Sequence, residues 1–246
     1  MNFYQETFKV RSNETDANQN ITIPSLASYL QEVAWSHSIE LKMSFHDLIP
    51  KGLTWVMFRL AMYLEKLPKH GEKVTIETWP SGATAKHAFR DYRVLDANGK
   101  LIGTAKSSWV IFDFHQRKVV PLPDFIKNTP IDADRENVEY KQEKISVGKQ
   151  FELKKDIGVG WYDIDVNRHV NNLSYIRWLL DTLPVNFLQK QRLKELDIVF
   201  RAESSLGDQL KLLANQLSSE EGQFDHCIVK EDKALIIAKT EWEAIK

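Results

Sequence analysis

The stretch IDVNRHVNNLSYIRWLLDT, residues 164–182, passes from polar residues directly into an apolar pattern with helical spacing. It aligns without gaps on an earlier stretch, TDANQNITIPSLASYLQEVA, residues 15–34, in which a similar polar run precedes a similar helical pattern. The two copies predict two equivalent helices, near residues 25–41 and 172–183, each entered through a polar segment.

Two further similarities follow in the same order along the chain. LPKHGEKVTIE resembles ESSLGDQLKLL, and TAKSSWVIF resembles IAKTEWEAI with Trp109 aligned on Trp242. Three similarities in one order indicate an internal repeat. Asn98-Gly99 is a strong hairpin turn signal. The segments rich in β-branched and aromatic residues are typical of strands and cover residues 54–64, 73–79, 87–96 and 100–114, then 151–160, 193–219, 223–230 and 233–245.

The repeat predicts an α+β protein in which each half has one long helix followed by an antiparallel meander. One helix cannot cover both faces of a sheet, so the simplest packing wraps each sheet around its own helix. Three prolines and many charges in residues 115–150 indicate a surface connection between the halves. We therefore expect a first unit over 1–125, a linker over 126–148 and a second unit over 149–246.

Composition and charge exclude several classes of protein. With 43% hydrophobic and 27% charged residues, the 246-residue chain is typical of a soluble globular protein. Its formal net charge of −1 provides no global field for nucleic acid or an anionic membrane. No stretch approaches the roughly 20 apolar residues of a membrane span, and the opening MNFYQETFKV has no signal-peptide character. We expect a cytoplasmic protein that binds neither nucleic acid nor membrane.

Few residues are available for a disulfide, a metal or a cofactor. The single cysteine, Cys227, lies in an apolar run and is expected to be a small core residue. His37 and His46 lack a third ligand at metal spacing, so zinc is not expected. The sequence has no glycine-rich phosphate loop, and we expect no cofactor.

The motif DIDVNRHVNN, with FRAESSLGD downstream, resembles the acyl-acyl-carrier-protein thioesterases of plants and bacteria. Nearly the whole chain takes part in the resemblance, including WVMFRLAMYLEKLPKHGEKVTIETWP in the first half. The resemblance implies two tandem hot-dog folds, each a curled antiparallel sheet around a long helix. It also implies hydrolysis of acyl-carrier-protein thioesters to free fatty acids, with acyl carrier protein as the partner and no cofactor.

Carried over position by position, the resemblance implies a catalytic set of four residues in the second half. These are Asp165, Asn167, His169 and Glu203. Ser204 stands where plant members have a cysteine, and this departure counts against cysteine catalysis in the present chain.

The first half lacks the matching catalytic residues. In the internal alignment, Asn20 stands at the histidine position and Leu67 at the glutamate position. By family resemblance, the acyl tunnel lies largely in this half. Its apolar residues are the candidates for binding the acyl chain, with plain core as the alternative for each: Trp55, Met57, Leu60, Met62 and Phe89.

The residue types of the motif fit thioester hydrolysis, which needs an activated water and a stabilised oxyanion. In an extended segment, Asp165, Asn167 and His169 would project to one side, because strand side chains alternate. Glu203 is expected to act as the general base for water, or to orient the water with His169. Asn167 would position the water or the substrate carbonyl, and Asp165 would fix neighbouring polar groups or assist the water.

The helix start at 170–172 is expected to bind the substrate carbonyl. Free N–H groups at a helix N-terminus carry partial positive charge, so Val170 and Asn171 are assigned to substrate binding. Asp and Asn before a helix are also common caps, and capping is the alternative for Asn171 and Asn172. Asp163 is expected to be a solvated turn residue.

The carrier, the exact reaction and the assembly stay open at this level. Acyl carrier protein is acidic, so its docking surface should be basic, and Lys86, Arg90, Arg168 and Arg177 are candidates by sequence position alone. An acyl-CoA thioesterase, a hot-dog dehydratase and a non-catalytic acyl-binding module are the alternative functions. A homodimer is one alternative for the oligomeric state.

Overall fold

The computed structural model describes residues 3–131, 135, 138, 144–148, 150–166, 168–217 and 222–245. Its two long helices, α1 (Ile23–Glu40) and α4 (Asn172–Leu180), fall where the repeat predicts them. The other elements of the first half are β1 (Tyr4–Lys9), η1 (Ser12–Glu14), α2 (Phe45–Leu48), η2 (Ile49–Lys51), β2 (Leu53–Leu64), β3 (Lys73–Ala83), β4 (Ala88–Leu95), β5 (Leu101–Asp113), β6 (Lys118–Val120) and α3 (Asp124–Lys127). Those of the second half are β7 (Leu153–Gly158), η3 (Trp161–Asp163), α5 (Val185–Leu188), β8 (Gln191–Phe200), β9 (Gln209–Gln216), β10 (Gln223–Lys230) and β11 (Lys233–Ala244).

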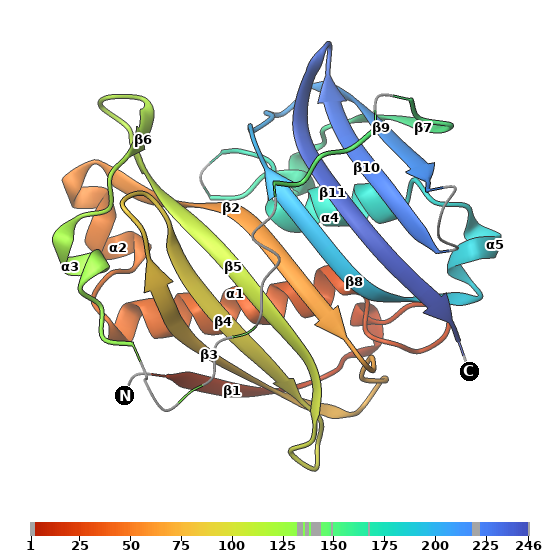
Figure 1. The fold of residues 1–246 in the computed structure, drawn as a ribbon, viewed down its shortest axis with the longest axis horizontal. Helices are drawn as coiled ribbons and strands as arrows, with labels where there is room; N and C mark the ends of the chain where they lie inside the picture. The colour runs from red at the N-terminus through yellow and green to blue at the C-terminus, as the bar shows by residue number, and fades with distance from the viewer. Residues whose placement is uncertain are drawn as a thin grey trace.

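The strands form one continuous antiparallel sheet in the order β1-β3-β4-β5-β2-β8-β11-β10-β9-β7, with β6 paired to β5 outside this path (Figure 1). The second half repeats the strand order of the first in reverse, so β2 and β8 meet in the middle. In that central pair Leu60 lies opposite Ile198. Two equivalent sheets are therefore joined edge to edge.

The expected simple meander is wrong for one strand in each half. β3, β4 and β5 follow one another as hairpins, and the predicted Asn98-Gly99 turn joins β4 to β5, with Gly99 at a φ of 78°. β2, however, pairs with β5 rather than with β3, and β8 likewise pairs with β11. Strand pairing is a long-range choice that local strand propensity does not encode.

Both long helices lie on the same side of the sheet, which curls around them (Figure 1). α1 packs on β1 and β3, α4 packs on β9 and β10, and the two helices also contact each other. Their apolar stripes, with Leu30 and Val33 on α1 and Ile176 and Leu179 on α4, enter one buried core shared by the two halves. Each half is thus a curled sheet around a helix, which confirms the expected tandem hot-dog fold.

Equivalent side-chain contacts occur in the two halves and support the internal repeat. The indole N–H of Trp109 donates to the hydroxyl of Ser107 at 2.7 Å, two residues earlier on β5. The indole N–H of Trp242 donates to the hydroxyl of Thr240 at 2.8 Å, two residues earlier on β11. The pairing of Trp109 with Trp242 in the sequence alignment is therefore confirmed.

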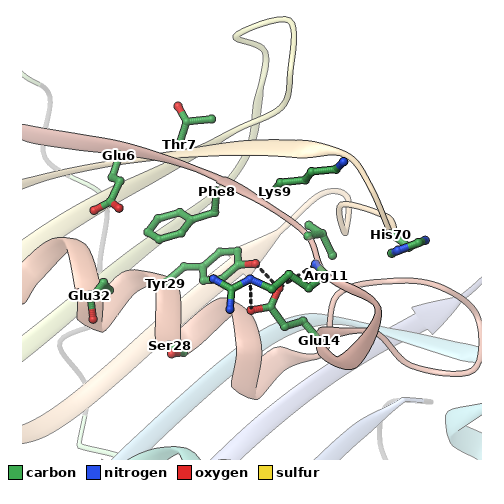
Figure 2. Close-up of a pocket in the computed structure, with 11 residues that line it drawn as sticks. Glu6, Thr7, Phe8, Lys9, Arg11, Glu14, Ser28, Tyr29, Glu32 and His70 are labelled. Atoms are coloured by element: carbon green, nitrogen blue, oxygen red, sulfur yellow. Dashed lines mark hydrogen bonds and ion pairs between the residues drawn. The ribbon is translucent and has the colours of Figure 1, made fainter.

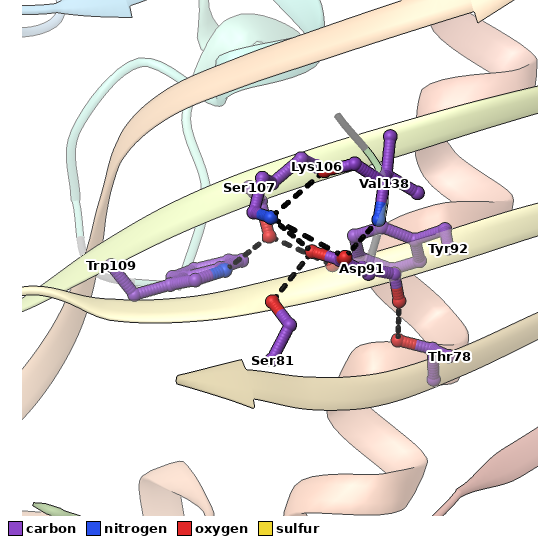
Figure 3. Close-up of polar contacts among 8 residues, drawn as sticks. All are labelled: Thr78, Ser81, Asp91, Tyr92, Lys106, Ser107, Trp109 and Val138. Atoms are coloured by element: carbon purple, nitrogen blue, oxygen red, sulfur yellow. Dashed lines mark hydrogen bonds and ion pairs between the residues drawn. The ribbon is translucent and has the colours of Figure 1, made fainter. Parts of the chain in front are cut away.

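Two buried aspartates hold the connection between the halves on the outer face of the sheet. Asp91 on β4 accepts the backbone N–H of Val138 at 2.6 Å and lies 3.1 Å from Nζ of Lys106 (Figure 3). At the matching place on β10, Asp225 accepts the backbone N–H of Gly148 at 2.8 Å. Of the predicted linker, 126–148, these segments lie outside the described residues: 132–134, 136–137 and 139–143.

Cys227 is buried on the outer face of β10, beside Ile145 and Val199, as expected for a core cysteine. Burial raises the pKa of its thiol to about 11, so the thiol stays protonated near neutral pH.

Among the helices of the described ranges, none is long and apolar enough to cross a bilayer.

Candidate active site

The polar segment before α4 is a tight turn. The N–H of Asp165 donates to the carbonyl of His169 at 2.9 Å, and the N–H of Arg168 donates to the carbonyl of Asp165 at 3.0 Å. Arg168 has a φ of 64°, a left-handed conformation. The expected extended segment is therefore wrong, because a closed turn does not alternate its side chains as a strand does. Asn167, the third residue of the predicted triplet, lies outside the described residues.

The same turn occurs in the first half, where the histidine and glutamate are absent. The N–H of Asp16 donates to the carbonyl of Asn20 at 2.8 Å, and Gln19 has a φ of 65°. The carboxylate of Asp16 accepts the N–H groups of Asn18 and Asn20 at 2.8 and 2.9 Å. An aspartate at this position thus shapes the turn even without catalysis, which supports the expectation that Asp165 fixes its neighbours.

His169 and Glu203 approach each other from two separate segments. Nε2 of His169 lies 3.3 Å from Oε2 of Glu203, and their side chains are 40% and 48% exposed. Glu203 lies in the connection after β8 and not within a strand as expected. The N–H of Val170 donates to the carbonyl of Ser204 at 3.1 Å, one residue beyond each member of the pair. This backbone bond keeps the two side chains side by side.

Ser204 is a buried anchor for the glutamate segment. It is 2% exposed, its hydroxyl lies 2.6 Å from the hydroxyl of Tyr175, and its N–H donates to the same Tyr175 oxygen at 2.8 Å. Burial raises the pKa of Tyr175, so its phenol stays protonated and cannot serve as a base for Ser204. The burial of Ser204 and its hydrogen bonds to Tyr175 support the expectation that it is not the nucleophile.

At the start of α4 most of the expected carbonyl donors already have partners. The N–H of Val170 is bonded to Ser204, and the N–H of Asn171 donates to the carbonyl of Asp163 at 2.8 Å. The side chain of Asn171 accepts the N–H of Leu173 at 2.9 Å and is the N-cap, the alternative role foreseen for it. Val170 and Asn171 are therefore not free N–H donors. Among the described residues, the N–H of Asn172 has no acceptor.

Asp163 ties the turn to the helix, so the expectation of a solvated residue is wrong. Its carboxylate accepts the N–H of Gly160 at 3.0 Å, the hydroxyl of Ser174 at 3.1 Å and Nη2 of Arg177 at 2.8 Å. One side chain thereby joins the segment before η3 to the first two turns of α4.

A large pocket, of about 1070 Å³, runs from this polar edge into the first half. Its second-half wall includes Asp165, His169, Asn171, Asn172 and Glu203. Its first-half wall is mostly apolar and includes the following side chains: Trp35, Phe45, Trp55, Met57, Phe58, Phe89, Trp109 and Phe112.

The predicted acyl-binding residues divide between this pocket and the core. Trp55, Met57 and Phe89 line the pocket, and the indole N–H of Trp55 donates to the carbonyl of Met43 at 2.8 Å, which fixes the orientation of the ring. Leu60 and Met62 are buried in the core, the alternative foreseen for them.

The four basic candidates for carrier docking also divide. Lys86 and Arg168 are exposed, and Arg177 is exposed but paired with Asp163. Arg90 is buried against the pocket, so its assignment to a docking surface is wrong: its side chain faces inward from β4.

Two family models match the chain over its two halves. Residues 1–129 match the acyl-ACP thioesterase N-terminal domain, and residues 146–244 match the acyl-ACP thioesterase C-terminal domain. The chain belongs to the acyl-ACP thioesterase family. This family membership confirms the resemblance carried by the motif and its downstream glutamate.

Curated relatives of this acyl-ACP thioesterase family member include two chloroplastic plant proteins. The palmitoyl-acyl carrier protein thioesterase of Arabidopsis thaliana is 27% identical over 266 residues, covering 98% of this chain and 64% of that protein. The palmitoyl-acyl carrier protein thioesterase of Cuphea hookeriana is 28% identical over 256 residues, covering 97% of this chain and 62% of that protein. The chain thus spans less than two thirds of the length of these relatives.

Solved structures of the family share the fold. An acyl-ACP thioesterase from Bacteroides thetaiotaomicron superposes with a TM-score of 0.90 at 26% identity, covering 98% of both chains. A 12:0-ACP thioesterase from Umbellularia californica superposes with a TM-score of 0.89 at 21% identity, covering all of this chain and 98% of that one. The second likeness concerns the fold alone.

A second hollow of this family member, of about 840 Å³, lies between β1 and α1 (Figure 2). None of the predicted site residues lines it. The hydroxyl of Tyr29 donates to Oε2 of Glu14 at 2.6 Å, and burial together with Glu14 raises the pKa of Tyr29. Glu14 supports the first-half turn as Asp163 supports the second-half turn, because its backbone carbonyl accepts the N–H of Thr22 at 2.8 Å. This hollow therefore belongs to the scaffold.

Proposed function

We propose that the protein hydrolyses fatty acyl thioesters of acyl carrier protein and releases the free fatty acid. One observation carries the proposal: a pocket of about 1070 Å³ is apolar along the first half and ends at His169, Glu203 and the start of α4. A thioester bound there would place its acyl chain among aromatic side chains and its carbonyl at the polar edge. The proposed organisation of the chain is a first unit over 1–125, a linker over 126–148 and a second, catalytic unit over 149–246.

In the proposed reaction, a water molecule attacks the thioester carbonyl. Glu203 takes one proton from the water. His169, whose Nε2 lies 3.3 Å from Oε2 of Glu203, orients the carboxylate and the water. The new C–O bond forms as the carbonyl becomes an oxyanion. The C–S bond then breaks, and the carrier thiolate leaves with the proton that the site took from the water. The products are a fatty acid and the free carrier thiol.

The proposed oxyanion donor is the N–H of Asn172. It stands at the N-terminus of α4 and lines the pocket, and the other first-turn N–H groups named above are engaged. Removing one such donor typically raises the barrier by about 2.7–4 kcal/mol. Asn171 would hold this N–H in place as the cap, and Asn167 keeps its proposed task of positioning the water or the carbonyl.

The proposed docking surface for the carrier surrounds the mouth of the pocket. Trp161 and Tyr162 in η3 and Val166 in the turn are exposed apolar side chains, and Val166 lines the pocket. Large exposed apolar side chains mark interaction surfaces. Arg168, two residues after Val166, adds a positive charge that suits an acidic carrier. Trp161 and Tyr162 were not predicted as docking residues from the sequence. Their position just before a polar turn was the available signal, because core side chains are unusual there.

Variants of the proposed docking surface should affect binding of the carrier protein without affecting hydrolysis of the thioester. Arg168→Glu and Tyr162→Ala should raise KM for an acyl-carrier-protein substrate several-fold and leave KM for a small acyl thioester nearly unchanged. The Arg168 effect should shrink at high salt, because exposed charges are screened. Lys51→Glu, on η2, is the charge control. Equal effects on both substrates would place the carrier elsewhere.

Thiol release tests the proposed function directly. Wild-type protein is assayed on carrier-protein and CoA thioesters of graded chain length, beside Glu203→Gln. Turnover of carrier-protein thioesters that falls in the variant supports the proposal. Turnover of CoA thioesters alone would make the protein an acyl-CoA thioesterase, and binding without any thiol release would make it an acyl-binding module.

A further inference from the structure

The apolar wall of the pocket contains a buried positive charge. Arg90, on β4, is 9% exposed and lines the pocket. Its Nη1 lies 3.0 Å from Nδ1 of His37 on α1 and donates to the hydroxyl of Thr78 on β3 at 3.2 Å. The helix and two strands thus converge on one guanidinium group.

Arg90 has no carboxylate partner within the described ranges of the chain. The other buried arginine, Arg59, forms a two-pronged ion pair with Asp197, which is the usual arrangement for a buried charge. A guanidinium carries five N–H donors and stays protonated in proteins. Both contacts of Arg90 use Nη1, so Nε and Nη2 have no acceptor among the described residues.

A second buried donor lines the same pocket from α1. The side-chain Nε2 of Gln31 is fully enclosed and has no hydrogen-bond partner within the described part of the chain. An amide nitrogen is a donor only. Two residues that line the pocket, one on β4 and one on α1, therefore carry N–H groups without an acceptor among the described residues, in a lining that is otherwise mostly apolar.

A plain alkyl chain would leave these donors unsatisfied. A buried donor without a partner destabilises the bound complex, and a charged donor does so more strongly than a neutral one. An oxygen atom on the bound chain would accept hydrogen bonds from them. Sites built to bind a substrate hydroxyl can reject the analogue that lacks it by up to about 10⁴-fold or more, because their own polar groups then stay unpaired.

We propose that the pocket selects fatty acyl chains that carry an oxygen acceptor remote from the thioester, and that Arg90 and Gln31 bind this oxygen. The substrate class is an acyl thioester with a hydroxyl, oxo or carboxylate group on its chain. The positive charge of Arg90 favours the carboxylate within this class. The inference rests on the proposed function for the reaction at the thioester and adds the nature of the chain.

Matched substrates test the inference. Carrier-protein thioesters of dodecanoic acid, its terminally hydroxylated derivative, its terminal oxo derivative and dodecanedioic acid are compared by kcat/KM. The wild type should prefer at least one oxygen-bearing chain to the unsubstituted chain by about tenfold or more. Arg90→Met should abolish the preference for the carboxylate, and Gln31→Met should weaken the preference for the hydroxyl or oxo chain.

Two controls keep the outcome interpretable. Arg93→Met removes a positive charge from the opposite face of β4, where Arg93 lies over the ring of Trp79, and should keep the wild-type preference. Arg90→Met removes one contact each from His37 and Thr78 and can lower stability. Gln31→Met removes a side-chain donor that has no hydrogen-bond partner among the described residues, and this variant should fold normally.

The possible results separate the inference from the proposed function. If all four chains are hydrolysed with equal kcat/KM, the inference fails and the thioesterase proposal stands. If none is hydrolysed, the thioesterase proposal fails, and the Kd values of the same thioesters, measured by calorimetry on Glu203→Gln protein, decide the inference. Equal Kd values overturn it, and tighter binding of an oxygen-bearing chain supports it.

Discussion

The paired side chains of His169 and Glu203 are the clearest candidates for catalysis. They lie 3.3 Å apart, both are partly exposed, and both line the same pocket. Glu203→Gln and His169→Ala should each lower kcat by about a hundredfold or more, the range of a lost general acid–base group. Thiol release at saturating substrate is the measurement, and Glu152→Gln, an exposed carboxylate of the second half, is the matched control.

Ser204→Ala provides the contrast to these two variants. The Tyr175 hydroxyl would still accept the N–H of residue 204, so stability should fall by only about 1 kcal/mol, the worth of one hydrogen bond. Activity should stay within tenfold of the wild type. An acyl group trapped on Ser204, or complete loss of activity in the alanine variant, would replace the water mechanism with covalent catalysis.

His226 makes the stability of the fold depend on pH. It is buried on β10, Nε2 lies 2.8 Å from the hydroxyl of Thr240, and burial lowers its pKa from 6.5 to about 3. Above pH 6.5 neither the folded nor the unfolded state holds the proton, so the contribution of His226 is fully present. Below that pH only the unfolded state binds it, so stability falls by about 1.4 kcal/mol per pH unit.

Chemical denaturation at several pH values checks this contribution. His226→Gln should flatten the decline of unfolding free energy between pH 6 and pH 4, because the variant has no histidine to titrate. Tyr92 stands at the equivalent place in the first half and contacts the hydroxyl of Ser107 at 3.1 Å, so a neutral side chain fits this position. An unchanged slope would mean that carboxylates alone cause the acid sensitivity.

At the residue scale, the motif predicted His169 and Glu203 as site residues but not the residues that hold them in place. His169 and Glu203 were predicted because their residue types match thioester chemistry and a family pattern. Asp163 and Tyr175 were missed because their tasks, tying a turn to a helix and holding Ser204, depend on contacts between segments. Arg90 was wrongly assigned to an exposed docking surface because an arginine in a strand is usually exposed. The residues around it do not indicate that its side chain faces inward, where the structure buries it.

Among the elements, the start of α4 connects stability to chemistry. The side chain of Asn171 caps the helix, and the neighbouring Asn172 N–H is the proposed oxyanion donor. Asn171→Ala should destabilise the protein by about 0.5–2 kcal/mol, and Asn171→Asp should restore most of this loss because Asp also caps. Thermal unfolding gives the stability, and kcat at a temperature where each variant is folded gives the effect on the site.

The cap variants also test the oxyanion assignment. If the N–H of Asn172 binds the oxyanion, fraying of the first turn in Asn171→Ala should lower kcat more than it raises KM. Asn171→Asp should recover the fold, and its kcat then reports the effect of a negative charge beside the carbonyl. Normal kcat in the alanine variant would move the oxyanion site away from this helix.

Local sequence patterns predicted the elements better than their pairing. The two helices, the Asn98-Gly99 hairpin and most strands follow from periodicity and turn chemistry within short windows. The place of β2 beside β5 and the turn at residues 165–169 do not, because both are decided by hydrogen bonds to distant or folded-back backbone. A period-two polar run is compatible with a strand and with a turn, and only the observed backbone bonds distinguish them.

At the scale of the whole molecule, the repeat predicted two equivalent halves but not how they join. The alignment of residues 15–34 with 164–182 predicts equivalent helices. In the structure, the strand order of the second half is the reverse of that of the first, so β2 and β8 are neighbours in the sheet. This arrangement places the apolar wall of the first half next to the polar turn of the second, so a single pocket spans both. The contact between halves could not be read from a pattern that describes each half alone.

The seam between the halves contains a buried ion pair that should hold them in register. Nε of Arg59 on β2 lies 2.7 Å from Oδ1 of Asp197 on β8, and Nη2 lies 2.5 Å from Oδ2. Removing one partner leaves the other charge buried, so Arg59→Met should cost about 3–5 kcal/mol of unfolding free energy. Arg59→Met with Asp197→Leu should recover part of this loss, because no unpaired charge then remains.

Denaturant titration followed by fluorescence and circular dichroism measures both variants and the cooperativity of unfolding. Because one apolar core includes residues of α1 and α4, the wild type should unfold in a single transition reported equally by both probes. The Arg59→Met variant weakens the only strand pair that joins the halves within the described residues, so a second transition is expected there. A wild type that already unfolds in two steps would show that the halves are stable independently and that the ion pair serves the register of β2 and β8 alone.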